Sequence, residues 1–128
     1  WLTLRTSLGR NNDTNQGYLF SELINTFRFN DWLAFNISPK YIFSGVESFS
    51  ALGVSSYINL INNLMFIPEI NASFISESDP NFSLALRYSF HQGKSFDLYY
   101  SNAAGTQDIG QVFEDKNHRF GINLNFLY

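Results

Sequence analysis

Apolar and polar residues alternate strictly along the last residues of the chain. Phe120, Ile122, Leu124, Phe126 and Tyr128 occupy every second position, and the positions between them up to residue 125 hold glycine or asparagine. A period of two over such a length is typical of a β-strand that has one apolar and one polar face. We therefore predict a strand over residues 118–128.

Seven earlier segments show the same alternation. They lie at about residues 2–8, 18–29, 33–43, 52–60, 64–74, 82–91 and 96–101. Turn-forming residues separate these predicted strands. Tight turns are expected at Asn30-Asp31, Asn62-Asn63 and Gln92–Lys94, and longer loops at residues 9–17, 44–50, 76–81 and 103–117. The connections therefore alternate between long and short along most of the chain.

Two features depart from a clean strand pattern. In the second predicted strand, the polar residues Ser21 and Asn25 occupy positions of the apolar face, which allows a bulge there. Pro39 and Pro68 lie within the third and fifth strands, and each removes one hydrogen-bond donor from the sheet. At each proline we expect a local bulge, or a hydrogen bond replaced by an interior side chain or a water molecule.

The alternation within the strands and the alternation of loop lengths are together typical of one class of protein. Membrane-spanning barrels have strands of this kind, with short turns on one side and longer loops on the other. The chain resembles a bacterial outer-membrane β-barrel, with an OmpA-like architecture or as the C-terminal strands of a larger porin-like barrel. For residues 1–128 the resemblance implies an all-β fold, an antiparallel up-and-down transmembrane β-barrel of about eight strands. It also implies that Phe126 and Tyr128 belong to the signal that the outer-membrane assembly machinery reads.

Composition narrows the class of protein. Charged residues make up 15% of the chain, below the roughly 25% of an average soluble domain. Aromatic residues reach 18%, and a mean hydropathy of -0.14 without a long apolar run excludes a helical membrane protein. The chain contains no cysteine, and a net charge of -3 predicts no nucleic-acid partner. Because it begins at Trp1, we expect a processed form or a fragment.

The two faces of the predicted strands carry different kinds of residue. Small polar residues dominate the polar face, and a few charged residues of both signs are spaced along it. We predict that these charges form a network inside the barrel: Arg5, Glu22, Arg28, Lys40, Glu69, Arg87, Asp97 and Arg119. The predicted membrane-facing residues are Phe35, Ile37, Leu84, Leu86, Tyr88, Ile122, Leu124 and Phe126. In a soluble barrel or sandwich, these apolar residues would instead point inward and form a dry core.

One short segment suggests catalysis. Ser101-Asn102 is similar to the end of the His-x-Ser-Asn signature of outer-membrane lipid A deacylases, which would make Ser101 the nucleophile. The histidine of that signature corresponds to Tyr99, which cannot serve as the base. A hydrolase would need His118, or His91, to supply the base from a neighbouring strand. No spacing of histidine, cysteine and carboxylate indicates a metal site, and no cofactor is expected.

The sequence thus predicts an integral protein of a bacterial-type outer membrane, with the lipid bilayer as its main partner. A complete eight-stranded barrel would have a structural or docking role without a wide pore. Three alternatives stay open: part of a porin-like passive channel, in which case oligomers are possible; a lipid hydrolase that uses Ser101; and a soluble ligand-binding β-barrel.

Overall fold

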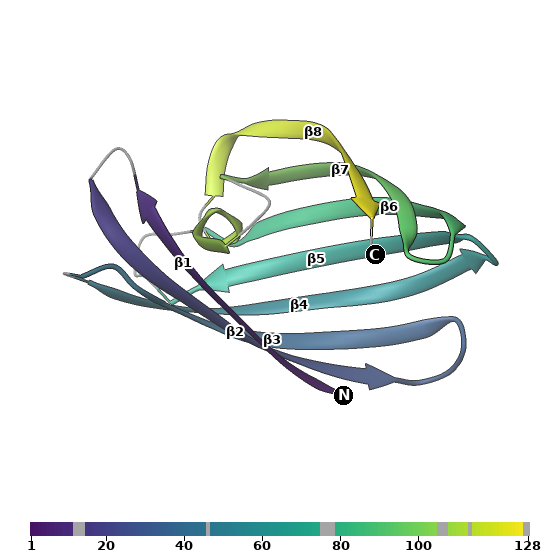
Figure 1. The fold of residues 1–128 in the computed structure, drawn as a ribbon, viewed down its shortest axis with the longest axis horizontal. Helices are drawn as coiled ribbons and strands as arrows, with labels where there is room; N and C mark the ends of the chain where they lie inside the picture. The colour runs from purple at the N-terminus through teal and green to yellow at the C-terminus, as the bar shows by residue number, and fades with distance from the viewer. Residues whose placement is uncertain (12–14, 46, 75–78, 105–107, 113, 127–128) are drawn as a thin grey trace.

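Eight antiparallel strands form one continuous sheet that curls into half a barrel (Figure 1). The computed structural model describes residues 1–11, 15–45, 47–74, 79–104, 108–112 and 114–126. The strands are β1 (Leu2–Asn11), β2 (Gln16–Arg28), β3 (Leu33–Phe43), β4 (Ser48–Ile61), β5 (Leu64–Ser73), β6 (Asn81–His91), β7 (Lys94–Ala103) and β8 (Glu114–Phe126). Each strand pairs with its neighbours in sequence, which confirms the predicted all-β, up-and-down fold.

The register of the sheet keeps like residues together. On one face, Leu86 pairs with Leu98, and Leu98 pairs with Ile122. On the other face, Glu22 lies between Arg5 and Lys40. Because successive side chains of a strand point to opposite faces, this register gives an apolar face and a polar face that extend across the whole sheet.

The sheet is open at both edges and forms half of a barrel. The strand order begins at β1 and ends at β8, and these two strands form no ladder with each other in the described part of the chain. Leu4 in β1 is 67% exposed and Phe120 in β8 is 83% exposed. Both edges therefore present unpaired backbone groups and uncovered apolar side chains.

Two predicted loops contain more regular structure than the sequence pattern indicated. Within residues 9–17, β1 continues to Asn11 and β2 begins at Gln16. The ring of Tyr18 fills the space next to Gly9 where a Cβ atom would lie. The polar residues here pair as strands, from Gly9 with Tyr18 to Asn11 with Gln16. Within residues 103–117, a short 3-10 helix, η1 (Asp108–Gln111), precedes the first residues of β8.

The two prolines are accommodated without a shift of register. Pro39 pairs with Leu52 on β4, and Pro68 pairs with Leu84 on β6. On its other side, each proline faces a short interruption of the ladder, after which pairing resumes in the same register. The expected bulges at the prolines and in the middle of β2 are therefore wrong: the missing donors open gaps in the ladder without inserting a residue.

A small apolar cluster lies on the polar face, near the longer connections. Phe20 from β2, Ile42 from β3, Ala51 from β4 and Val112 after η1 are buried together, with Tyr18 and Phe49 packed against them. We call these four buried residues the interior cluster. Figure 1 shows η1 in the hollow of the curled sheet, and both the N-terminus and the end of β8 toward the end with the short turns. The polar face is thus the concave face. In the described part of the chain, no helix has the length and apolar character required to cross a membrane.

Candidate functional site

The concave face brings charged residues from β2, β3 and β5 together around Lys40. The Nζ atom of Lys40 lies 3.4 Å from Oε1 of Glu22 and 3.3 Å from Oε1 of Glu69, and it donates a hydrogen bond of 2.5 Å to Oδ1 of Asn71. Its side chain is completely buried. We call Glu22, Lys40, Glu69 and Asn71 the Lys40 network. A buried ammonium group requires such partners, because an isolated charge is costly in a medium of low polarity.

Gly53 makes this convergence possible. It lies on β4, where it pairs with Asn71 on β5 and with Ser38 on β3, two residues from Lys40. A Cβ atom at Gly53 would lie 2.6 Å from Oδ1 of Asn71 and 3.1 Å from Cε of Lys40. The lysine side chain therefore crosses β4 through space that every other residue type would fill.

Polar side chains connect the Lys40 network to η1. Asn71 donates hydrogen bonds to Oε1 of Glu69 at 2.9 Å and to Oδ1 of Asn81 at 3.2 Å. Asn81 in turn donates to the carbonyl oxygen of Gln111 at 2.8 Å, and Lys40 donates to the side chain of Gln111 at 3.4 Å. The last residue of η1 is therefore held by both its main chain and its side chain.

A second charged group occupies the half of the concave face nearer the short turns. Arg87 on β6 donates two hydrogen bonds to Asp97 on β7, of 2.7 and 2.8 Å. Asn125 on β8 donates a third to the same carboxylate at 2.9 Å. This forked geometry is the strongest arrangement for an arginine and a carboxylate. The Arg87 side chain is nevertheless 36% exposed, in contrast to Lys40.

The structure thus joins six of the eight predicted interior charges into two groups. Arg5 belongs to the first, because its Nη1 atom lies 3.5 Å from Oε2 of Glu22. Arg119 lies apart and donates to the carbonyl oxygen of Ala104 at 2.6 Å. Arg28 lies near the short turns, beside a hollow of about 230 Å³.

The convex face carries the predicted membrane-facing residues. Half-exposed apolar side chains cover it from β1 to β8, as far as the structure describes these strands. The predicted residues Phe35, Ile37, Leu84, Leu86, Tyr88, Ile122, Leu124 and Phe126 all have the parity of this face. Tyr128, the other half of the expected assembly signal, lies outside the described residues.

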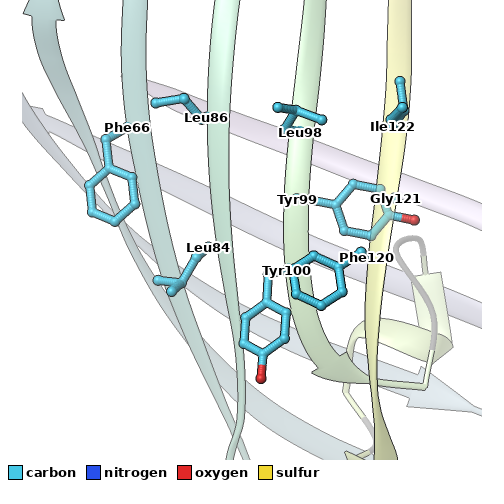
Figure 2. A pocket seen from close by; sticks show the side chains of 9 residues that line it. All are labelled: Phe66, Leu84, Leu86, Leu98, Tyr99, Tyr100, Phe120, Gly121 and Ile122. Atoms are coloured by element: carbon cyan, nitrogen blue, oxygen red, sulfur yellow. The ribbon is translucent and has the colours of Figure 1, made fainter.

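A groove of about 670 Å³ crosses β5–β8 on the convex side (Figure 2). Phe66, Leu86, Leu98 and Ile122 form one of its walls as a row across four strands. Leu84, Tyr100 and Phe120 form the other wall, and Gly121 lies between the two rows. The lining is almost entirely carbon, which suits hydrocarbon chains and offers little for recognition of a polar ligand.

Ser101 and His118 are placed on opposite faces of the sheet. The Ser101 hydroxyl group contacts Ser83 at 2.6 Å and donates to the carbonyl oxygen of Phe82 at 2.8 Å, on the concave face. Nδ1 of His118 lies 2.6 Å from the hydroxyl oxygen of Tyr100, and the two rings are stacked. Because Tyr100 and Ser101 are consecutive in a strand, their side chains point to opposite sides. This geometry brings no imidazole base to Ser101.

Among the described residues, no three or more histidine, cysteine or carboxylate side chains are grouped so that they could hold a metal ion. The main polar features of the concave face are the two charged groups and the polar side chains around η1. Comparison of the sequence with protein-family models gives no match, and comparison with curated proteins gives no significant match.

Several important concave residues were absent from the sequence-based list. Asn71, Asn81 and Gln111 are neutral, and Gly53 has no side chain. The alternation of residues did place Gly53 and Asn71 on the polar face, where the structure has them. Gln111 follows no strand pattern, and its contact with Lys40 spans 71 positions of sequence. Only the path of the chain in space could reveal that contact.

Proposed function

We propose that this chain is an integral outer-membrane β-barrel protein and forms part of the wall of a porin-like channel. One observation carries the proposal: the distribution of residues is inverted relative to a soluble protein. Large apolar side chains cover the convex face, whereas buried charged and amide side chains occupy the concave face.

The energetics of the convex face favour a hydrocarbon environment. Monomeric soluble proteins rarely expose apolar patches larger than a few hundred Å². Here the exposed residues continue across the sheet, for example from Leu4 and Leu23 through Ile37 and Ile70 to Ile122. In a bilayer these side chains would contact lipid, and the sheet would satisfy most backbone groups internally. A soluble ligand-binding barrel would leave the same surface in water.

The open curvature favours the porin-like alternative over a closed eight-stranded barrel with a structural role. A closed barrel of eight strands is filled by its own side chains, whereas barrels of about 16 strands leave an aqueous passage. The eight strands of this sheet form only half a barrel. Further strands, from the same polypeptide or from a second copy, would close a wider cylinder with the Lys40 network on its inner wall.

A pair of substitutions tests the assignment of the faces. Leu98 on β7 faces outward, and Asn123 on the neighbouring strand β8 faces inward. Leu98→Arg would place a cation in lipid and should lower the free energy of unfolding by about 2–4 kcal/mol if the residue lies near the bilayer midplane. Asn123→Arg is the matched control and should have little effect. Urea unfolding in lipid vesicles measures both, and equal effects of the two substitutions would contradict the proposal.

Channel activity is tested by single-channel recording in planar bilayers. We expect discrete current steps from the wild-type protein. A protein that inserts and shows heat-modifiable gel migration, but conducts no current, would favour a structural role. A protein that stays monomeric and folded in water without detergent would exclude the membrane assignment altogether.

A further inference from the structure

The groove that crosses β5–β8 on the convex side is bordered by two aromatic side chains with polar atoms, Tyr100 and His118. The hydroxyl group of Tyr100 points away from Leu98 (Figure 2), and its oxygen lies 2.6 Å from Nδ1 of His118. The two rings are stacked with their centroids 5.4 Å apart. The rings of Phe82 and Phe120 lie against Tyr100, with centroids 5.8 and 4.7 Å away. Neighbouring rings therefore hold the Tyr100–His118 pair in place.

The Tyr100–His118 pair offers a hydrogen-bond donor in each of its protonation states. When the Tyr100 hydroxyl group donates to Nδ1, the neutral imidazole carries its proton on Nε2, and that N–H group can donate to a ligand. When Nδ1 donates to the hydroxyl oxygen instead, the hydroxyl hydrogen can do so. An imidazolium ring leaves both donors. The pair therefore suits a ligand group that only accepts hydrogen bonds, such as an ester carbonyl or a phosphate oxygen.

The groove beside the pair is almost entirely carbon, and much of it is uncovered. Leu98 is 46% exposed and Ile122 is 64% exposed. The volume of about 670 Å³ lies in the range of small-molecule sites, about 300–1,000 Å³. The groove and the pair together match an amphiphile, in which a hydrocarbon chain is joined to a group of hydrogen-bond acceptors.

We propose that the groove holds one acyl chain of a membrane phospholipid, and that the Tyr100–His118 pair donates to the ester or phosphate oxygens of that lipid. The proposal rests on the membrane assignment made above, and it adds a specific lipid site to the face that contacts the bilayer. A phospholipid fits both parts of the site, because its acceptor oxygens directly adjoin its acyl chains.

The position of the site along the strands agrees with this occupant. Leu98 and Ile122 lie nearer the middle of β7 and β8, whereas Tyr100 and His118 lie closer to the ends with the longer connection. In a bilayer, this order places the groove at the depth of the hydrocarbon and the polar aromatic pair toward the headgroups, where such side chains are enriched.

The first test blocks the groove. The full chain is reconstituted in vesicles of phosphatidylethanolamine and phosphatidylglycerol, extracted in a mild detergent and analysed by native mass spectrometry. We expect the wild type to retain a phospholipid, and Leu98→Trp, whose indole ring would occupy the groove, to lose it. Ile37→Trp is the control, because Ile37 lies on the same face outside the groove and is 43% exposed, close to the value for Leu98. This control should retain lipid as the wild type does.

The second test removes the donors and keeps the rings. In the double variant Tyr100→Phe, His118→Phe, the affinity for phosphatidylglycerol titrated into the detergent-solubilised chain should fall by about twofold to tenfold, as expected for the loss of one hydrogen bond. The double variant Tyr41→Phe, Ser48→Ala is the matched control. Tyr41 donates to Ser48 at 3.1 Å on the same face, outside the groove, so this affinity should stay unchanged.

A third measurement needs no substitution. Phosphatidylglycerol with a diazirine group on its acyl chain should crosslink in the wild-type protein to the peptides that line the groove, in β5 to β8.

The outcomes separate the lipid site from the membrane assignment. If the wild type inserts into vesicles, but the crosslinks spread evenly over the convex face and Leu98→Trp retains as much lipid as Ile37→Trp, the lipid site is overturned and the membrane assignment stands. A wild-type dimer that covers the groove and retains no lipid would also overturn the lipid site. If the chain stays folded in water and does not insert, both proposals fail.

Discussion

The two charged groups of the concave face differ in how they are enclosed. The Lys40 network joins β2, β3 and β5 beneath Gln111, and its lysine has no exposed surface. The Arg87–Asp97 pair joins only the adjacent strands β6 and β7, and its arginine is 36% exposed. The same residue chemistry therefore serves two purposes. The first group also links β3 to β5, with which it does not pair, and to the last residue of η1. The second reinforces a ladder that already exists.

The largest effect is expected from removal of the buried cation. Lys40→Met would leave the buried Glu22 with Arg5 as its cationic partner and would remove the lysine partner of the partly exposed Glu69. The free energy of unfolding should fall by about 3–5 kcal/mol, as for other buried ion pairs that lose one member. Urea unfolding in lipid vesicles, followed by tryptophan fluorescence, measures the change.

The triple variant Lys40→Met, Glu22→Gln and Glu69→Gln sharpens this result. It removes the two glutamate charges together with the lysine, so most of the lost stability should return. A triple variant as unstable as Lys40→Met alone would show that the enclosed network is not held by charge pairing.

A smaller effect is expected at the glycine that the lysine crosses. Gly53→Ala would place a Cβ atom 2.5 Å from the hydroxyl oxygen of Ser38 and 2.6 Å from Oδ1 of Asn71. The neighbouring side chains must shift, at a cost of about 1–3 kcal/mol, typical of an overpacked site. Gly17→Ala is the control, because the nearest atom to its Cβ would be 3.9 Å away. Equal unfolding midpoints for the two variants would contradict the crossing of Lys40 over β4.

The smallest effect is expected at the Arg87–Asp97 pair, whose arginine is partly exposed and whose aspartate is buried. Arg87→Met should lower the free energy of unfolding by about 1 kcal/mol, less than Lys40→Met, because solvent screens the partly exposed guanidinium group and Asn125 still donates to the Asp97 carboxylate. The difference from the wild type should shrink further in concentrated salt. Unfolding curves at low and high ionic strength test this prediction. A loss of unfolding free energy that is independent of salt and as large as that of Lys40→Met would contradict the difference between the two groups.

Much of the fold was predictable because strand faces are encoded locally. The alternation around Leu84, Arg87 and Tyr88 predicted β6 and both of its faces, and the register of the neighbouring strands follows the same parity. The loop at residues 9–17 was less predictable. Its polar residues are typical of turns, yet Gly9 and Tyr18 pair as part of an extended hairpin.

The candidate site was predictable only in part. Polar parity selected Glu22, Lys40 and Glu69, but their sequence positions could not show that they meet around one ammonium group. The pairing of Ser101 with His118 as nucleophile and base was compatible with neighbouring strands. It finds no geometric support, because the two side chains leave the sheet on opposite faces.

By itself, the sequence determined the eight alternating segments, their antiparallel order and the two faces of the sheet, because a period of two is a property of neighbouring residues. Only the tertiary structure decided the degree of curvature, the absence of pairing between β1 and β8 in the described residues, and the inward path of η1. These features depend on the twist accumulated over many strands and on contacts between distant residues, such as Lys40 with Gln111. No local sequence pattern encodes the accumulated twist or these long-range contacts.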